Sequence, residues 1–246
     1  MKKIILFDLD GTIINYGCKI DDEMIQYILN VKKLGYEIGV VSERRLEGIM
    51  NLSRNFIFGH IFSECGSVYN LYNGYTFKQI YKNNIKNHKT YNQINLLIKT
   101  ALDFISKVDY SISGHLIDIR NGLIYISLIG AQASDNERNT FIETDKDKNY
   151  TIKLLDILKK MIDDTKLSDD IYVGKGGMTG IVIYPREWNK SQVVDYLKDY
   201  DEIVFLGNSY EKSENDYEII THSKIKGYKI NSIEEIKQLL ITYSKK

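Results

Sequence analysis

Residues 4–14, which read IILFDLDGTII, constrain the fold of this chain more than any other stretch. Four apolar residues run without alternation into the acidic string DLDGT, a pattern typical of a strand buried on both faces of a parallel sheet. Because side chains alternate along a strand, Asp8 and Asp10 start from the same side and can converge on one ligand. Gly11 lets the chain turn sharply there and brings backbone N–H groups close to that ligand.

Two carboxylates at the end of a buried strand are costly unless a cation or a donor compensates them. The arrangement suits phosphoryl transfer, in which Asp8 attacks phosphorus and Asp10 protonates the leaving oxygen and later deprotonates the incoming one. Mg²⁺ would offset the repulsion between these carboxylates and a phosphate. The alternative is an ordinary acidic turn, which the apolar run before it and the Gly-Thr after it disfavour.

Composition sets the class of protein. The chain has 246 residues and is 43% hydrophobic, enough for one large domain or two small ones. Lys and Arg number 33, as do Asp and Glu, so net charge argues neither for nor against nucleic acid or a membrane, and we predict neither partner. Two cysteines make no disulfide framework, and no stretch approaches the roughly 18 apolar residues of a membrane span. We expect a soluble, cytoplasmic protein.

A strand–helix–strand unit follows the acidic string. Residues 21–35 have helical apolar spacing, and residues 36–41 form a second apolar run. This order predicts a parallel sheet with ligands bound beyond the carboxyl ends of its strands. Ser42 therefore falls near Asp8, where it could bond a phosphate oxygen. It could equally cap the helix that starts at Arg45, and a hydroxyl can do both.

The pattern changes after residue 80, where antiparallel signals replace parallel ones. Two apolar runs around Asn121-Gly122 predict a hairpin, and Ser134 with Glu137 forms a capping box. We predict a core domain from residues 1–80 and 186–246 and an inserted cap from residues 81–185, with Pro185 at the exit. Further elements are expected as helices at 89–108, 134–146, 152–162, 191–198 and 233–241 and strands at 171–173, 181–184 and 202–207.

Five blocks in this order resemble the eukaryotic-type phosphomannomutases, a family of the haloacid dehalogenase (HAD) superfamily. The blocks are FDLDGTI, FSECGSVYN, IDIRNGLIYISLIG with ERNTF and DK, YPREWNK, and FLGN with NDYEI. The resemblance covers almost the entire chain. It implies an α/β fold with a HAD-like Rossmannoid parallel-sheet core and an inserted α/β cap made of an antiparallel sheet plus helices.

The resemblance also implies roles for residues of the core. Asp8 becomes the nucleophile and a Mg²⁺ ligand, and Asp10 the acid/base whose backbone carbonyl binds the metal. Lys190 would neutralise the aspartyl phosphate. Asn208 and Asp216 would complete or support the metal site. On sequence physics alone, Lys190 could instead lie on a solvated face.

Five further residues are predicted to bind a sugar phosphate. Ser42 and Arg44 belong to the second core motif, whereas Arg120, Asn121 and Arg138 belong to the cap. The cap arginines would grip the sugar's distal phosphate through their planar guanidinium groups. The other interpretation of Arg138 is a surface salt bridge.

Several positions depart from the resembled family. Gly17 and Ala131 stand where it has arginines, Gly180 and Val182 replace a serine and an aspartate, Asn208 replaces a metal-binding aspartate, and Ser42-Glu43-Arg44 replaces Gly-Gly-Ser. The last change looks more like the Thr-Gly-Arg of HAD sugar phosphatases. Each lost charged hydrogen bond is worth about 1.5–3 kcal/mol, so the grip on a bisphosphorylated hexose should weaken.

Three functions remain open at this point. The first is a Mg²⁺-dependent HAD phosphotransferase acting on a sugar phosphate, as a mutase or as a phosphatase. The second is a catalytically degenerate member that binds a ligand or a partner through the cap. The third is a true phosphomannomutase in which Lys175 or Arg186 replaces the missing contacts. By resemblance, we also expect a homodimer formed through the cap.

Overall fold

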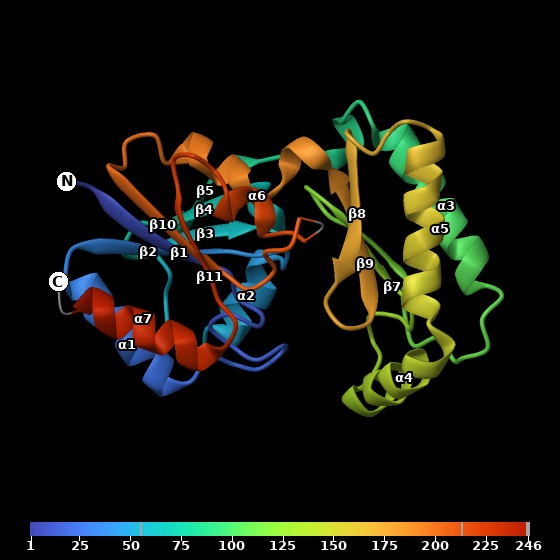
Figure 1. The fold of residues 1–246 in the computed structure, drawn as a ribbon, viewed down its shortest axis with the longest axis horizontal. Helices are drawn as coiled ribbons and strands as arrows, with labels where there is room; N and C mark the ends of the chain where they lie inside the picture. The colour runs from blue at the N-terminus through green and yellow to red at the C-terminus, as the bar shows by residue number, and fades with distance from the viewer. Residues whose placement is uncertain (55, 213, 245–246) are drawn as a thin grey trace. The chain divides into compact units, whose positions relative to one another are not determined.

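The computed structural model describes residues 1–54, 56–212 and 214–244, and the chain forms two compact units (Figure 1). The first combines Met1–Asn83 with Trp188–Lys246, and the second is Asn84–Glu187. The first is built on a mainly parallel sheet and the second on an antiparallel sheet. The predicted α/β class is therefore confirmed.

Seven strands form the sheet of the first unit, in the order β11-β10-β1-β2-β3-β4-β5. From β11 to β3 all neighbours are parallel, and β4 and β5 add an antiparallel hairpin. Because the carboxyl ends of parallel strands meet at one edge, Asp8, Ser42 and Asn208 follow three strands to the same edge. The strands are β1 (Lys3–Phe7), β2 (Tyr36–Val41), β3 (His60–Ser63), β4 (Val68–Tyr72), β5 (Phe77–Lys82), β10 (Glu202–Gly207) and β11 (Lys226–Lys229).

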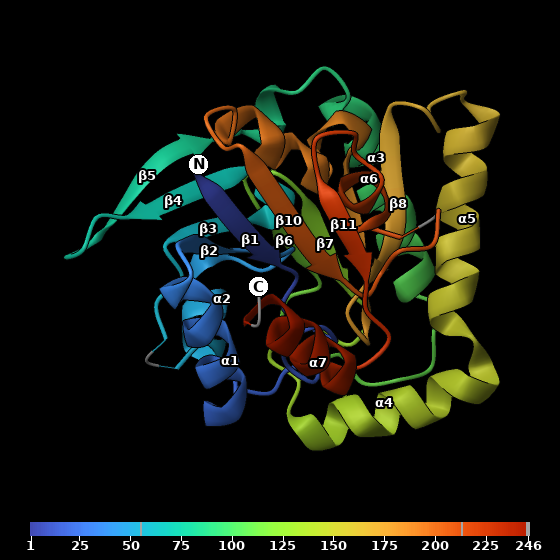
Figure 2. The same ribbon diagram turned by 60° about the vertical axis from the view of Figure 1, so that its left-hand side comes forward.

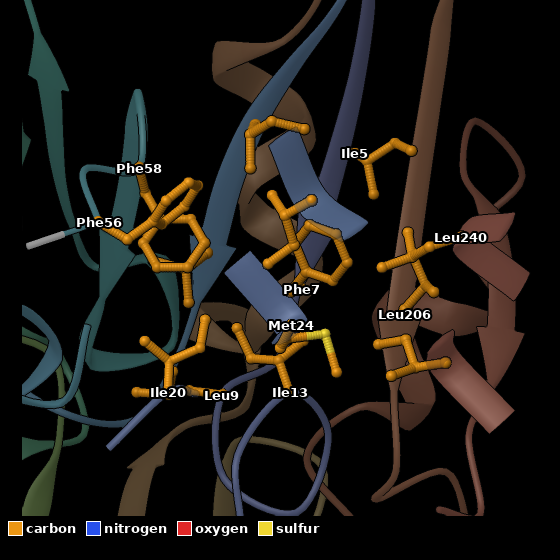
Figure 3. Close-up of a cluster of buried hydrophobic side chains, with 14 of the residues drawn as sticks. Ile5, Phe7, Leu9, Ile13, Ile20, Met24, Phe56, Phe58, Leu206 and Leu240 are labelled. Atoms are coloured by element: carbon orange, nitrogen blue, oxygen red, sulfur yellow. The ribbon is translucent and has the colours of Figure 1, made fainter. Parts of the chain in front are cut away.

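Alternate side chains of β1 enter two separate cores. Ile5 and Phe7 belong to the cluster drawn in Figure 3, whereas Ile4 and Leu6 belong to the cluster on the other face. All four are fully buried, which explains the unbroken apolar run. The first face is covered by α1 (Asp22–Lys33), α2 (Leu46–Leu52) and α7 (Ile233–Ser244), and the second by α6 (Tyr217–Ile220) and the 3₁₀ helix η4 (Lys190–Tyr196).

Two local features need comment. The helix predicted at residues 191–198 is present, as the 3₁₀ helix η4. Side chains three residues apart share a face of a 3₁₀ helix, so η4 can bury both Lys190 and Val193. Ser42 does not cap the next helix, because Arg45 is the N-cap of α2 and makes no side-chain cap bond. The hydroxyl of Ser42 instead accepts a bond from the backbone N–H of Arg44, 3.2 Å away.

The second unit is a four-stranded antiparallel sheet in the order β6-β7-β9-β8, with α3 and α5 packed together along it (Figures 1 and 2). The hairpin at Asn121-Gly122 joins β6 to β7, and the Ser134–Glu137 capping box opens α4, both as predicted. Within the described part of the chain, no helix has the length and apolar character needed to cross a membrane. The elements are α3 (Tyr91–Ile105), β6 (Ile117–Ile119), β7 (Ile124–Ser127), α4 (Asp135–Lys148), α5 (Tyr150–Asp164), β8 (Ile171–Gly176) and β9 (Gly180–Pro185).

Candidate active site

Asp8, Lys190 and Asp216 form a buried charged group at the carboxyl edge of the parallel sheet. The Lys190 ammonium donates to Asp8 Oδ1 at 2.7 Å and to Asp216 Oδ1 at 2.6 Å. Lys190 is only 1% exposed, so the alternative of a solvated lysine is wrong. Three chain segments that are far apart in sequence thus meet at the predicted nucleophile.

Burial dominates the electrostatics of this group. Removal from water raises the pKa of Asp8 to about 7, against the opposing effect of Lys190. Burial also raises the pKa of Asp216. Burial alone would lower the pKa of Lys190, but Asp216 and Asp8 outweigh it and raise that pKa well above its usual value. Two carboxylates share one ammonium, so a further cation would stabilise their ionised forms.

Thr12 connects Asp8 to Asn208. Its Oγ1 is 3.2 Å from Asp8 Oδ2 and 3.1 Å from Asn208 Oδ1, so two oxygens from two strand ends converge on one point. The amide nitrogen of Asn208 donates to the Tyr16 hydroxyl at 3.3 Å, which directs the amide oxygen toward Thr12. Sequence reasoning assigned Thr12 no role, although its hydroxyl directly follows Asp10-Gly11 in the motif. Gly11 is required here, because a Cβ at φ +80° would lie 2.5 Å from Asn208 Nδ2.

Asp10 is paired with Arg44 from the loop after β2. Arg44 donates from Nε to Oδ2 at 2.5 Å and from Nη2 to Oδ1 at 2.9 Å, while the backbone N–H of Gly17 donates to Oδ1 at 3.0 Å. Arg44 thus brings a guanidinium to the same carboxylate oxygen that the backbone N–H of Gly17 contacts.

A second loop contact lies beside this group and was not predicted. The amide nitrogen of Asn215 donates to Glu43 Oε1 at 2.6 Å, which ties the loop before α6 to the loop after β2. Both residues stand next to predicted site residues, but nothing in the sequence says that the two loops meet. The contact helps to hold Arg44 and Asp216 in their places.

The predicted metal ligands are brought together only in part. Within residues 1–54, 56–212 and 214–244, no group of three or more His, Cys, Asp or Glu side chains could hold a metal ion. Both carboxylate oxygens of Asp216 have partners, Lys190 and the backbone N–H of Ser209. The converging oxygens of Asp8 and Asn208 are the hard donors that Mg²⁺ prefers, so these two residues fit the ion. One of the two donors is a neutral amide oxygen and the other is a carboxylate oxygen.

Arg120 and Arg138 of the second unit lie near opposite ends of β7. Arg120 donates to Asp118 Oδ2 at 2.7 Å, and its backbone N–H bonds Leu123 just before β7. Arg138 donates to Thr179 Oγ1 at 3.3 Å and to the backbone carbonyls of residues 131 and 133. The carbonyl of Thr179 in turn accepts a hydrogen bond from the backbone N–H of Leu128, just after β7. Arg138 thus holds loop residues in place in this structure.

The three other cap residues singled out from the sequence have different environments. The Asn121 carbonyl accepts from the backbone N–H of Ile85 at 2.7 Å. Arg186 donates to the carbonyl of Ser168 at 2.9 Å, and Lys175 is exposed on β8.

Tyr125 fills the space next to Gly180. A Cβ at Gly180 would lie 2.5 Å from both Cζ and Oη of Tyr125, and one at Gly176 would lie 3.0 Å from its ring. The Arg120 guanidinium lies 5.1 Å from the centre of the same ring. The Tyr125 side chain of β7 thus occupies the space beside the two glycines.

The parallel-sheet unit with Asp8 and Lys190 at its edge, interrupted in sequence by an antiparallel-sheet unit, has the architecture of the HAD-type phosphotransferases. Two solved structures share the fold. A Candida albicans trehalose-6-phosphate phosphatase C-terminal domain matches with a TM-score of 0.63 and 13% identity, over 99% of this chain and 92% of that one. A Plasmodium falciparum IMP-nucleotidase with IMP bound matches with a TM-score of 0.63 and 13% identity, over 100% and 68%.

Sequence comparison gives the family. The model for eukaryotic phosphomannomutase matches residues 24–243. A phosphomannomutase of Dendrobium officinale is 30% identical over 236 residues, covering 94% of this chain and 90% of the relative, and one of Arabidopsis thaliana is 30% identical, covering 94% and 92%. The chain belongs to the eukaryotic phosphomannomutase family and is a phosphomannomutase-like enzyme, which confirms the resemblance found in the sequence.

Proposed function

We propose that this protein transfers the phosphoryl group of a sugar phosphate through an aspartyl phosphate at Asp8, with Mg²⁺ as its cofactor. The observation that carries the proposal is the buried contact between Asp8 and Lys190. A carboxylate oxygen of Asp8 attacks phosphorus, the bond from phosphorus to the sugar oxygen breaks, and Asp10 gives its proton to that oxygen. The Lys190 ammonium stabilises the added negative charge in a water-poor site.

The second half of the reaction decides between mutase and phosphatase. Asp10 removes a proton from the incoming oxygen, which attacks phosphorus and releases Asp8. If that oxygen is a sugar hydroxyl, the reaction is a mutase reaction. If it is water, the reaction is a phosphatase reaction. Ser42 and Arg44 are assigned to substrate binding in this scheme.

Asp8 and Asn208, with the backbone carbonyl of Asp10, would hold the Mg²⁺, and Asp216 would support it through Lys190. When bound, the ion supplies positive charge that offsets the repulsion between phosphate and carboxylate. An amide oxygen in place of a carboxylate removes one negative charge, so we expect weak binding of the ion.

The unit Asn84–Glu187 is proposed to be the cap that holds the distal end of the substrate. Arg120, Asn121 and Arg138 are its predicted contacts, and both guanidinium groups bond oxygens of the protein itself. A distal phosphate would have to compete with these oxygens. This weakened grip favours a phosphatase, or a mutase that acts on a sugar phosphate other than the usual one.

Turnover of mannose 1-phosphate with Mg²⁺ and a catalytic amount of hexose bisphosphate tests the proposal. Both the 6-phosphate and free phosphate are followed, with Asp8→Asn as the blank. Free phosphate alone would identify a phosphatase, and the 6-phosphate a surviving mutase. Unchanged product release by Asp8→Asn would refute the proposal. No product from a broad panel of phosphosugars would favour a protein that only binds a ligand.

The proposed assembly is a homodimer formed through the cap, as in the family that the sequence resembles. Light scattering of the purified chain tests this point directly, because the monomer mass is 28.6 kDa. A monomer at micromolar concentration would contradict it.

A further inference from the structure

The side chain of Gln192 links the segment that carries Lys190 to the turn after β3. Its amide nitrogen donates to the backbone carbonyl of Trp188 at 2.8 Å and to that of Cys65 at 2.9 Å. We infer that Gln192 is a positioning residue for phosphoryl transfer, which acts by fixing Lys190 against Asp8. This inference rests on the proposed function, because only there does Lys190 stabilise transferred charge.

The orientation of the Gln192 amide follows from its partners. Backbone carbonyls only accept hydrogen bonds, so those of Trp188 and Cys65 require the NH₂ group of the glutamine on their side. The Oε1 atom of Gln192 instead faces Asn83, whose amide nitrogen lies 3.4 Å away. The link therefore depends on donation by Gln192, and a side chain of similar length without N–H groups cannot form it.

The turn after β3 is a firm anchor for this link. Three consecutive residues are left-handed, Glu64 at φ +53°, Cys65 at φ +57° and Gly66 at φ +88°. Such a backbone is costly for residues with a side chain and persists only where the surroundings hold it. The backbone N–H groups of Glu64 and Cys65 donate to the carbonyls of Arg44 at 3.0 Å and Ser42 at 2.9 Å. The loop after β2 therefore holds the turn in place.

The link also fixes the start of η4, where Lys190 lies. Trp188 precedes the lysine by two residues and Gln192 follows it by two, so the bond between them closes a short ring of chain around it. A Cβ at Gly66 would lie 3.1 Å from Gln192 Cγ and 2.9 Å from Val193 Cγ1, so the turn and η4 are in close contact. A displacement of about 1 Å in a catalytic group can lower a rate about a hundredfold. Loss of the link should therefore reach the ammonium of Lys190.

Removal of the link should affect the transition state more than substrate binding. Lys190 is proposed to stabilise charge that develops during the transfer, whereas Ser42 and Arg44 are assigned to substrate binding. The bonds from the turn to the loop of Ser42 and Arg44 are made by backbone atoms and remain when the Gln192 amide is removed. A fall in kcat with little change in KM is the expected result.

Two variants test the inference in the full-length protein, with Mg²⁺ and para-nitrophenyl phosphate as substrate. Gln192→Met has a similar length but no N–H to donate, so kcat should fall about tenfold or more while KM stays within about threefold. Gln192→Asn keeps an amide that is too short to reach both carbonyls, so kcat should fall less. This milder variant also serves if Gln192→Met fails to fold.

Gln26→Met is the matched control, because it makes the same change at an exposed position of α1. Both kinetic constants should stay within about twofold of the unmodified protein. An unchanged kcat in the Gln192 variants would overturn the inference. A rise in KM as large as the fall in kcat would overturn it as well, because Gln192 would then act on substrate binding.

Inhibition constants separate positioning from support of the fold. Orthovanadate adopts the five-coordinate geometry of the phosphoryl transition state, whereas inorganic phosphate resembles the ground state. We expect Gln192→Met to weaken inhibition by vanadate about tenfold or more and inhibition by phosphate less than about threefold. A residue that only supports the fold would change resistance to urea and neither inhibition constant, and that result would contradict the inference. Absence of Asp8-dependent turnover in the unmodified protein would instead refute the proposed function, and this inference with it.

Discussion

At the scale of single residues, Lys190 shows how one ammonium holds the site together. It lies between Asp8 and Asp216, both nearly inaccessible to solvent. Removing the shared partner leaves two buried carboxylates side by side, which is costly. We therefore expect the same ammonium to serve both the stability of the fold and the proposed phosphoryl transfer.

We expect Lys190→Met to abolish turnover and to lower the free energy of unfolding by about 3–5 kcal/mol, as for other broken buried pairs. Urea unfolding measures the loss. Lys198→Met serves as the control, because its pair with Asp195 is solvent-exposed and should be worth less than about 1 kcal/mol. Equal effects of the two changes would contradict the assigned role of Lys190.

Asn208 limits the proposed metal site. Asn208→Asp restores a carboxylate beside Asp8, so we expect the Mg²⁺ dissociation constant to fall about tenfold, as measured by titration calorimetry. Asn92→Asp adds the same charge on an exposed part of α3 and should leave the Mg²⁺ dissociation constant unchanged. Tighter binding of Mg²⁺ by both variants would show that the added net charge, and not the position of the carboxylate, causes the change.

At the scale of elements, motifs of neighbouring residues predict the local structure well. Contacts between distant segments cannot be predicted from such motifs. The hairpin at Asn121-Gly122 and the capping box at Ser134 depend on neighbouring residues, and both are present. The type of η4, the position of Thr12 and the pairing of Arg44 with Asp10 depend on which loops meet. No residue near Arg44 in sequence indicates that its partner is 34 residues away.

The packing of Tyr125 against β9 gives a prediction at this scale. Gly180→Ser should lower the free energy of unfolding by about 1–3 kcal/mol, because its side chain meets the Tyr125 ring. Adding Tyr125→Ala removes the ring, so the cost of the serine should shrink in the double variant. Thermal unfolding of all four proteins in the cycle measures this coupling. Additive effects would show that the ring moves aside freely.

At the scale of the whole molecule, a polar cluster at the amino ends of β2 and β3 makes stability depend on pH. His60 contacts Glu37 at 2.6 Å and Tyr69 at 2.8 Å, and Tyr200 donates to the same glutamate at 2.7 Å. Burial lowers the pKa of His60 below its usual 6.5, against the opposing effect of Glu37. The unfolded chain therefore binds a proton at a higher pH than the folded protein does.

The contribution of His60 to stability should accordingly decrease as pH falls through about 6.5 toward its lowered pKa, because this residue binds more protons in the unfolded state in that window. Asp8, whose pKa is raised to about 7, contributes with the opposite sign there. At still lower pH, Glu37 adds a further loss of stability, because its pKa is lower in the folded protein than in the unfolded chain. Urea unfolding at a series of pH values measures the slope. His60→Gln should remove the His60 contribution, so that stability in the variant falls less, or rises more, between about pH 7 and pH 5.5 than in the unmodified protein. An unchanged slope would contradict this assignment.

The proposed covalent step at Asp8 depends on features at all three scales: the single residue, the edge of the sheet and the whole enzyme. Mass spectrometry of acid-quenched protein, after mixing with mannose 1-phosphate or another accepted phosphosugar and Mg²⁺, tests it most directly. The unmodified protein, quenched during turnover, should carry one phosphoryl group on the peptide that contains Asp8, and Asp8→Asn should carry none. Asp10→Asn should slow both halves of the reaction, because Asp10 is proposed to protonate the leaving oxygen and to deprotonate the incoming one. Turnover with no phosphoryl group on Asp8, or with the group on another residue, would contradict the account.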